Sequence, residues 1–236
     1  QLSSDLLFEP YSNNTAAILI TSSNVYLDLS YFTIINRNGK GDYGIIIARD
    51  VSNVTITGLN NEAQINDFNI AGIRVYGRTT NIKIENVSII QHTPKRITDS
   101  ILPDKCSDII NFRAAVGVSI GEGDTLGVHM LNTFKTNIVR GFKLLNTKIE
   151  GHMYGLHIIF TNDFVMDNCL FTKNTFYSTL IGSSWAVPGN NENGLEYPLG
   201  SGGVITNCRY ISNHSDNIAN SKPEGIFFFT VSISIG

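Results

Sequence analysis

Two basic and two acidic side chains lie where they could act together as general acids and bases. Arg74 and His157 each stand between two apolar residues of a short alternating run. Glu122 and Asp124 directly follow another such run, which contains Ser119. Because alternate residues of a strand point to opposite faces, Arg74, Ser119 and His157 are expected to face away from the apolar side. Carboxylates and an imidazole that meet in a groove can transfer protons, so Arg74, Glu122, Asp124 and His157 are the candidate catalytic set.

A plainer interpretation exists for the same residues. Glu122 and Asp124 also fit as solvated charges of a loop, and His157 also fits as an ordinary exposed strand histidine. Cys and His residues do not show the spacing of metal ligands, so the sequence predicts no metal site.

Aromatic residues provide a second kind of candidate site. Trp185, Tyr197 and Tyr154 have the flat apolar faces on which sugar rings stack. Together with the outward hydroxyl group of Ser119, they form the candidate substrate-binding set.

The elements that position these residues come from a repeat, which is clearest between Gly72 and Ile89. This stretch holds three short apolar alternations, centred on Arg74, Lys83 and Ser88. Each predicts a strand of about three residues with one buried face. Strands this short need stacked copies of themselves, and glycines open similar runs along the chain. These glycines are Gly44, Gly72, Gly117, Gly155, Gly182 and Gly225.

A second repeated position lies between the last two strands of the unit, and asparagine is its most frequent residue. Its expected members are Leu29, Gly58, Asn86, Gly141, Asn168 and Asn207. Glycine and asparagine positions alternate mostly every 14 residues, which gives a full period of 27 to 29 residues. Stacked amide side chains can bond to one another, so the sequence predicts an Asn ladder.

The repeat also carries a family resemblance. Gly-Ile-x-Val from Gly72, followed by Asn-Ile-x-Ile-x-Asn-Val-x-Ile from Asn81, resembles the repeat of right-handed parallel β-helices of the pectin-lyase-like superfamily. The resemblance covers about residues 18 to 235. It implies an all-β fold, a single-stranded solenoid of about six coils. It leaves function open, because lyases, hydrolases, phage tailspikes and non-catalytic surface proteins share this repeat.

The expected organisation is one domain with several loops. Residues 1–17 lack the repeat and are expected to form an N-terminal cap, and residues 18–236 form the β-helix. Insertions are expected next to the glycine-opened strands, at about 92–114, 122–135, 183–201 and 213–224. Such loops would wall a groove, which in the resembling enzymes is the substrate cleft. Its floor is the outward position of each opening strand: Ile46, Arg74, Ser119, His157, Ser184 and Phe227.

Enzyme chemistry is only partly supported. The segment Gly117–Gly121 resembles the Gly-x-Ser-Ile-Gly segment of polygalacturonase-like hydrolases, but Val116 stands where that family has a histidine. Those hydrolases also need paired carboxylates, and this chain has no Asp-Asp pair. Lyases of the superfamily hold Ca²⁺ with clustered acidic residues beside a basic one. If this protein is a lyase, Ca²⁺ is the expected cofactor; otherwise no cofactor is expected.

Composition narrows the partners. Of 236 residues, 16% are charged and the net charge is −3, which argues against a general nucleic-acid binder. No run approaches 18 apolar residues, so no membrane span is predicted. The chain begins at Gln1 without a leader or an initiator Met, which indicates a processed protein or an internal fragment.

We therefore predict an extracellular, virion or cell-surface β-helix module. It is expected to be non-catalytic, and either to bind a polysaccharide or another glycan or to serve as a structural component. The alternative is a polysaccharide lyase or glycoside hydrolase that acts in the loop-flanked groove.

Two further features bear on assembly. Cys169 and Cys208 follow Asn168 and Asn207, so they share one inward position, either as small buried residues or as a disulfide.

The run from Ile226 to Ile235 is apolar on both faces, which implies burial on both sides. We expect it to be covered by another subunit or by further chain.

Overall fold

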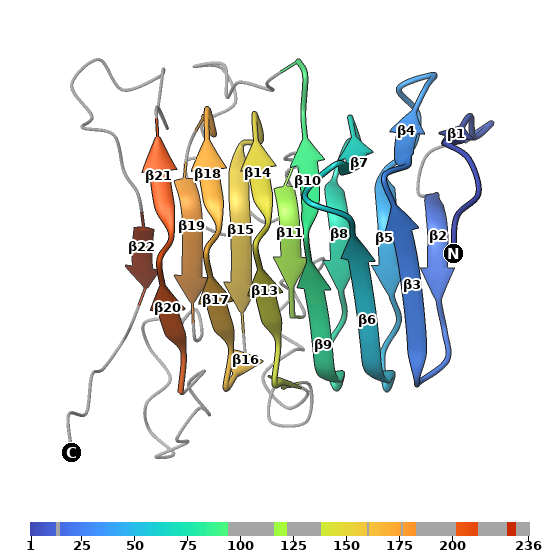
Figure 1. Cartoon of the computed structure of the whole chain (residues 1–236). Helices are drawn as coiled ribbons and strands as arrows, with labels where there is room; N and C mark the ends of the chain where they lie inside the picture. Colours follow the sequence, from blue (N-terminus) through green and yellow to red (C-terminus); the bar gives the residue numbers. More distant parts are fainter. Residues whose placement is uncertain are drawn as a thin grey trace, which may run out of the picture.

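The chain winds through three parallel sheets that enclose one apolar core. The computed structural model describes residues 1–12, 15–93, 116–121, 138–159, 161–175, 177–182, 202–211 and 226–229. In this part of the chain the regular elements are strands, and we find no helix long and apolar enough to cross a membrane. Figure 1 shows the strands side by side, from the blue N-terminal end to the red C-terminal end. Each coil passes in turn through the three sheets, which we call sheet 1, sheet 2 and sheet 3.

Sheet 1 holds the strands that the repeated glycines open. Its order is β2 (Ala16–Ile20), β5 (Tyr43–Ile47), β8 (Ala71–Val75), β11 (Val116–Ile120), β15 (Tyr154–Ile159), β19 (Tyr177–Gly182) and β22 (Ile226–Phe229). All six pairings are parallel. The parallel order means that equivalent residues of successive coils lie directly beside one another.

Sheets 2 and 3 complete each coil. Sheet 2 runs β3 (Val25–Ser30), β6 (Ser52–Gly58), β9 (Thr80–Glu85), β13 (Lys143–Leu145), β17 (Val165–Asp167) and β20 (Val204–Thr206), with β12 (Val139–Arg140) and β16 (Thr161–Asn162) at its margin. Sheet 3 runs β1 (Leu6–Phe8), β4 (Thr33–Asn36), β7 (Ala63–Asn66), β10 (Val87–Ile90), β14 (Lys148–Glu150), β18 (Leu170–Thr172) and β21 (Arg209–Ile211).

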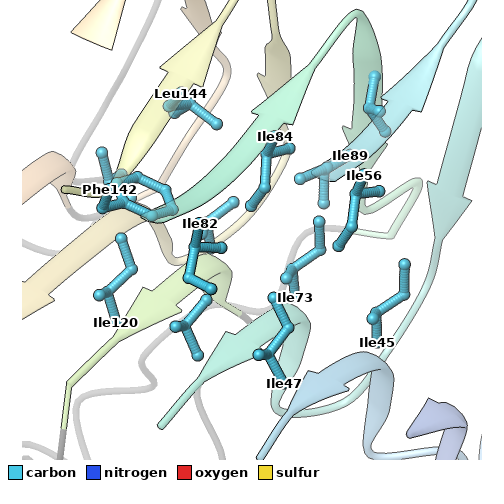
Figure 2. Close-up of a cluster of buried hydrophobic side chains, with 14 of the residues drawn as sticks. Ile45, Ile47, Ile56, Ile73, Ile82, Ile84, Ile89, Ile120, Phe142 and Leu144 are labelled. Carbon is cyan, nitrogen blue, oxygen red and sulfur yellow. The ribbon is translucent and has the colours of Figure 1, made fainter. Parts of the chain in front are cut away.

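The core forms because the inward residues of all three sheets are apolar. Ile73 of sheet 1, Ile84 of sheet 2 and Ile89 of sheet 3 are fully buried and gather in the space between the strands (Figure 2). Burying one such side chain contributes about 1.5–3 kcal/mol. Repetition of these positions in every coil is what lets strands of two to seven residues hold together.

The glycines that open the strands of sheet 1 lie in register with one another, and we call them the glycine column. This column follows the predicted register through four coils and then departs from it. Gly44, Gly72, Gly117 and Gly155 are neighbours, and a Cβ atom on Gly117 would lie 2.4 Å from the carbonyl oxygen of Gly155. Close packing of backbone against backbone therefore excludes larger residues here. The next member is Ser178, because Leu156 pairs with Thr179. The prediction of Gly182 was wrong by four residues, and a small side chain replaces the glycine.

The asparagine column needs two corrections. Leu145 pairs with both Glu85 and Asp167, so Asn146 rather than Gly141 stands beside Asn86 and Asn168. At the start of the chain Ser30, not Leu29, pairs with Gly58. In the corrected column the amide of Asn168 donates to Oδ1 of Asn146 at 2.9 Å. The amide of Asn207 bonds instead to Asp167, so the described residues form a partial ladder.

A second asparagine column lies at the beginning of the sheet 2 strands. Asn53 donates to Asn24 at 2.9 Å, and Asn81 donates to Asn53 at 3.1 Å. All three have positive φ angles, and Gly141, with φ 67°, packs against Asn81. Gly141 therefore belongs to this column, where its backbone conformation favours glycine or asparagine.

The N-terminal residues lie over the first coil. Strand β1 pairs in parallel with β4, and the backbone N–H of Leu2 donates to the carbonyl of Asp28 at 2.9 Å. Residues 1–12 thus pair with the first coil, with β1 as the first strand of sheet 3, and β2 begins at Ala16.

Candidate functional site

The outer side of sheet 1 carries a row of side chains at one register position, which we call the floor row. Ile73 and Val75 belong to the core, so Arg74 between them points outward. The register places Arg74 beside Ser119, and Ser119 beside His157. Among the described strands, the residues in register at this position are Leu19, Ile46, Arg74, Ser119, His157, Leu180 and Phe227.

Arg74 and Ser119 form a polar pair at the centre of this row. A guanidinium N–H of Arg74 donates to the hydroxyl oxygen of Ser119. Both side chains are buried, with 4% and 6% of their surfaces exposed. A buried cation is costly unless its donors are satisfied, so the hydrogen bond to the Ser119 hydroxyl offsets part of the cost of burying the Arg74 guanidinium group.

Tyr76 and Arg49 add an aromatic ring and a second cation to the same face. The guanidinium carbon of Arg74 lies 4.9 Å from the centre of the Tyr76 ring, and that of Arg49 lies 5.7 Å from it. Tyr76 is partly exposed and Arg49 is exposed. Both cations lie within the range at which a ring face attracts a positive charge. Solvent therefore reaches a site that combines positive charge with an aromatic surface.

His157 forms the other end of the polar row. Its ring stacks against Tyr154 with 6.1 Å between the ring centres. Burial, together with the positive charge of Arg74, lowers the pKa of His157 to about 4. The imidazole is therefore neutral near pH 7, and can donate one hydrogen bond and accept another.

Comparison with known proteins bears on the fold. No family model matches the sequence, and no curated protein matches it. Among solved structures, the crystal structure of the periplasmic alginate epimerase AlgG is similar, with a TM-score of 0.50 over 90% of this chain and 10% sequence identity. This chain is a right-handed parallel β-helix repeat protein. The predicted fold class is thus confirmed, and the chain matches 43% of the length of that epimerase.

The β-helix brings four of the eight predicted site residues to one face. Arg74, Ser119, His157 and Tyr154 all come from strands β8, β11 and β15 of sheet 1. The other four, Glu122, Asp124, Trp185 and Tyr197, lie outside the described residues. In the described part of the β-helix, no group of three or more His, Cys, Asp or Glu residues is arranged to hold a metal ion.

One detail of the predicted floor of the β-helix changes. Leu180 pairs with His157, so it occupies the position assigned to Ser184, which lies outside the described residues. This error follows directly from the misplaced Gly182. Phe227 pairs with Leu180 and keeps its predicted place.

Sequence reasoning missed Arg49 and Tyr76. Tyr76 stands two residues after Arg74, so period-two alternation would have placed it on the same face. It lies one residue beyond the end of β8, where the regular apolar pattern stops.

The segments predicted as insertions follow a consistent pattern in the β-helix. Residues 94–115 and 212–225 join sheet 3 to sheet 1, and residues 122–137 and 183–201 follow strands of sheet 1. These segments themselves lie outside the described residues. Every one of them thus enters or leaves the sheet that carries the floor row.

Proposed function

We propose that this protein is a non-catalytic module that binds a polysaccharide or another glycan on the outer face of sheet 1. The observation that carries the proposal is the arrangement of Arg49, Tyr76, Arg74, Ser119 and His157 on one face of consecutive coils. Neighbouring strands lie about 4.8 Å apart, so the site presents repeated polar and aromatic groups along one direction. An extended polymer can contact several of them at once.

The chemistry of these groups favours an acidic glycan. The exposed guanidinium group of Arg49 can bind a carboxylate through two parallel hydrogen bonds. The ring of Tyr76 offers a flat apolar face for a sugar ring. His157 supplies a neutral hydrogen-bonding group, while Arg74 adds positive potential from beneath the surface.

The composition of the floor row supports binding rather than catalysis. Among the described strands, no Asp or Glu occupies a floor-row position. A histidine with a pKa near 4 is also a weak base at neutral pH. A polysaccharide lyase or glycoside hydrolase remains the alternative function, and its carboxylates would be Glu122 and Asp124.

We also propose a location outside the cytoplasm, in the periplasm, on a cell or virion surface, or in the extracellular space. The similar solved structure is named as a periplasmic alginate epimerase, which motivates both parts of the proposal. A structural role in a larger assembly is compatible with the same location.

A polysaccharide panel tests the proposal. The protein would be incubated with neutral and acidic polysaccharides, and both the bound fraction and the released reducing or unsaturated sugars would be measured. We expect retention on acidic polymers that weakens as salt rises, because exposed charges are screened. Release of sugar fragments would instead support the lyase or hydrolase alternative, and absence of binding across the panel would contradict the proposal.

A further inference from the structure

Two cysteines share one position in neighbouring coils. Leu170 pairs with Arg209, so Cys169 and Cys208, which precede them, also lie side by side. The backbone N–H of Arg209 donates to the carbonyl oxygen of Cys169 at 2.8 Å. The same column contains Val87 and Thr147 in earlier coils. Cys169 belongs to the apolar core, and Cys208 packs against it.

The spacing of the two residues suits a disulfide. Adjacent strands lie about 4.8 Å apart, and disulfides join residues whose Cα atoms are about 4.4–6.8 Å apart. Each thiol also shifts the pKa of the other, Cys208 raising that of Cys169 and Cys169 lowering that of Cys208. Both cysteines are free in this structure, and the thiol of Cys169 contacts the carbonyl oxygen of Leu144 at 3.3 Å.

The two thiols differ in access to solvent. Cys169 is 1% exposed, whereas Cys208 is partly exposed. Burial raises the pKa of Cys169 to about 12, and burial also raises the pKa of Cys208. A reagent in solution can therefore reach Cys208, while Cys169 reacts only with a partner that is already inside the fold.

A covalent bond at Cys208 would tie the sixth coil, which contains β20 and β21, to the fifth coil. Strands β20 and β21 contain three residues each, and Val204 and Ile211 are about half exposed. Tyr210 stacks on Phe171 with 5.1 Å between the ring centres, and this contact joins the sixth coil to the fifth. The sixth coil is thus less well buried than the second to fifth coils, whose inward apolar residues belong to the buried core.

We propose that Cys169 and Cys208 form an oxidisable dithiol that closes to a disulfide between the fifth and sixth coils. With a small disulfide as oxidant, the Cys208 thiolate attacks one of its sulfur atoms and releases one small thiolate. Cys169 then loses its proton and attacks the Cys208 sulfur, which releases the second small thiolate. Two protein thiols and one small disulfide give one protein disulfide and two small thiols. This inference does not depend on the proposed ligand.

Oxidised glutathione tests the proposal in the intact chain. The Cys106→Ser variant removes the third cysteine, and folded protein would be oxidised, digested without reduction and mapped by mass spectrometry. We expect a peptide pair joined through Cys169 and Cys208, and a melting temperature about 5 °C or more above that of the reduced form. Should Cys106→Ser fold poorly, the wild-type peptide map still distinguishes this bond from pairs that contain Cys106.

Single variants test the order of reaction. Cys169→Ser should retain a mixed disulfide of glutathione at Cys208, whereas Cys208→Ser should leave Cys169 unmodified in the folded state. The proposal fails if Cys169 and Cys208 both keep free thiols after oxidation of the folded protein. It also fails if each carries glutathione and no bond joins them.

Discussion

The guanidinium group of Arg74 on β8 donates a hydrogen bond to the hydroxyl group of Ser119 on the adjacent strand β11. Both groups belong to the outer side of sheet 1, and yet both are buried. Breaking such a pair from one side leaves a buried charge without its acceptor, whereas removing both polar groups avoids that cost. The effects of substituting Arg74 and Ser119 on the free energy of unfolding should therefore not be additive.

Ser119→Ala should lower the free energy of unfolding by about 1–3 kcal/mol, because the Arg74 guanidinium loses an acceptor. The same change in an Arg74→Met background should cost clearly less, because no buried cation remains. Urea denaturation of the four proteins gives the coupling energy of the pair. Additive effects of the two substitutions would show that Ser119 does not stabilise Arg74.

The corrected asparagine column predicts two different costs at Asn168. This residue has a φ angle of 52° and donates to Asn146. Asn168→Gly should lose only the side-chain bond, whereas Asn168→Ala should lose the bond and also strain the left-handed backbone, at about 1–2 kcal/mol more. Thermal or urea denaturation measures the difference. Equal destabilisation by the two substitutions would argue against the left-handed turn.

Stability should fall as the pH drops from 6.5 towards 4. Burial lowers the pKa of His157 to about 4 from 6.5, so between these values the unfolded chain binds more protons than the folded one. The free energy of unfolding therefore rises with pH across this window, by less than about 1.4 kcal/mol per pH unit for one histidine.

A control for this pH effect comes from a second histidine. Burial lowers the pKa of His152 to about 3, so its contribution has the same sign. His157→Gln should reduce the slope between pH 5 and 6.5 without abolishing it, because His152 remains. An unchanged slope in His157→Gln would mean that His157 is not protected from protonation in the folded protein.

The sequence predicted the fold well because its repeat is carried by the core. Ile73, Arg74 and Val75 alternate at period two, which fixes both the buried face and the register of β8 against its neighbours. Gly72 and Gly117 lie where backbones approach closely, so their spacing marks successive coils. Features that every coil needs are visible in one sequence.

The errors arose where two positions accept the same residue types. Gly141 and Asn146 both have positive φ angles, and each lies at a turn that tolerates glycine or asparagine. Spacing alone could not separate them. Ser178 took the place of a glycine because a small side chain also fits, and the prediction moved on to Gly182.

The candidate site was less predictable, because it depends on contacts between coils that have no repeated sequence signal. The position of Arg74 followed from alternation, but its hydrogen bond to Ser119 and its contact with Tyr76 did not. The pKa of His157 depends on burial and on Arg74, which is two strands away. Contacts and pKa shifts of this kind can be derived only from the three-dimensional structure.

Strand β22 motivates a prediction about assembly. It is the last strand of sheet 1 in the described part of the chain, where it pairs with β19. A free strand edge invites further pairing, so we propose that another subunit or further chain covers it. Sedimentation over a range of concentrations should show association of the 236-residue chain. A monomer that stays soluble at high concentration would contradict the proposal.

The most direct measurement for the proposed function compares two tyrosine substitutions. The Tyr76 ring contacts the guanidinium groups of Arg49 and Arg74, whereas Tyr26 is 67% exposed on sheet 2. Titration calorimetry with the acidic polysaccharide that binds best would give Kd for the wild type, Tyr76→Ala and Tyr26→Ala. We predict that Tyr76→Ala raises Kd about 10-fold, the loss of about 1.4 kcal/mol of stacking energy, and that Tyr26→Ala leaves it unchanged. An unchanged Kd for Tyr76→Ala, or equal losses for both variants, would contradict binding on the outer face of sheet 1.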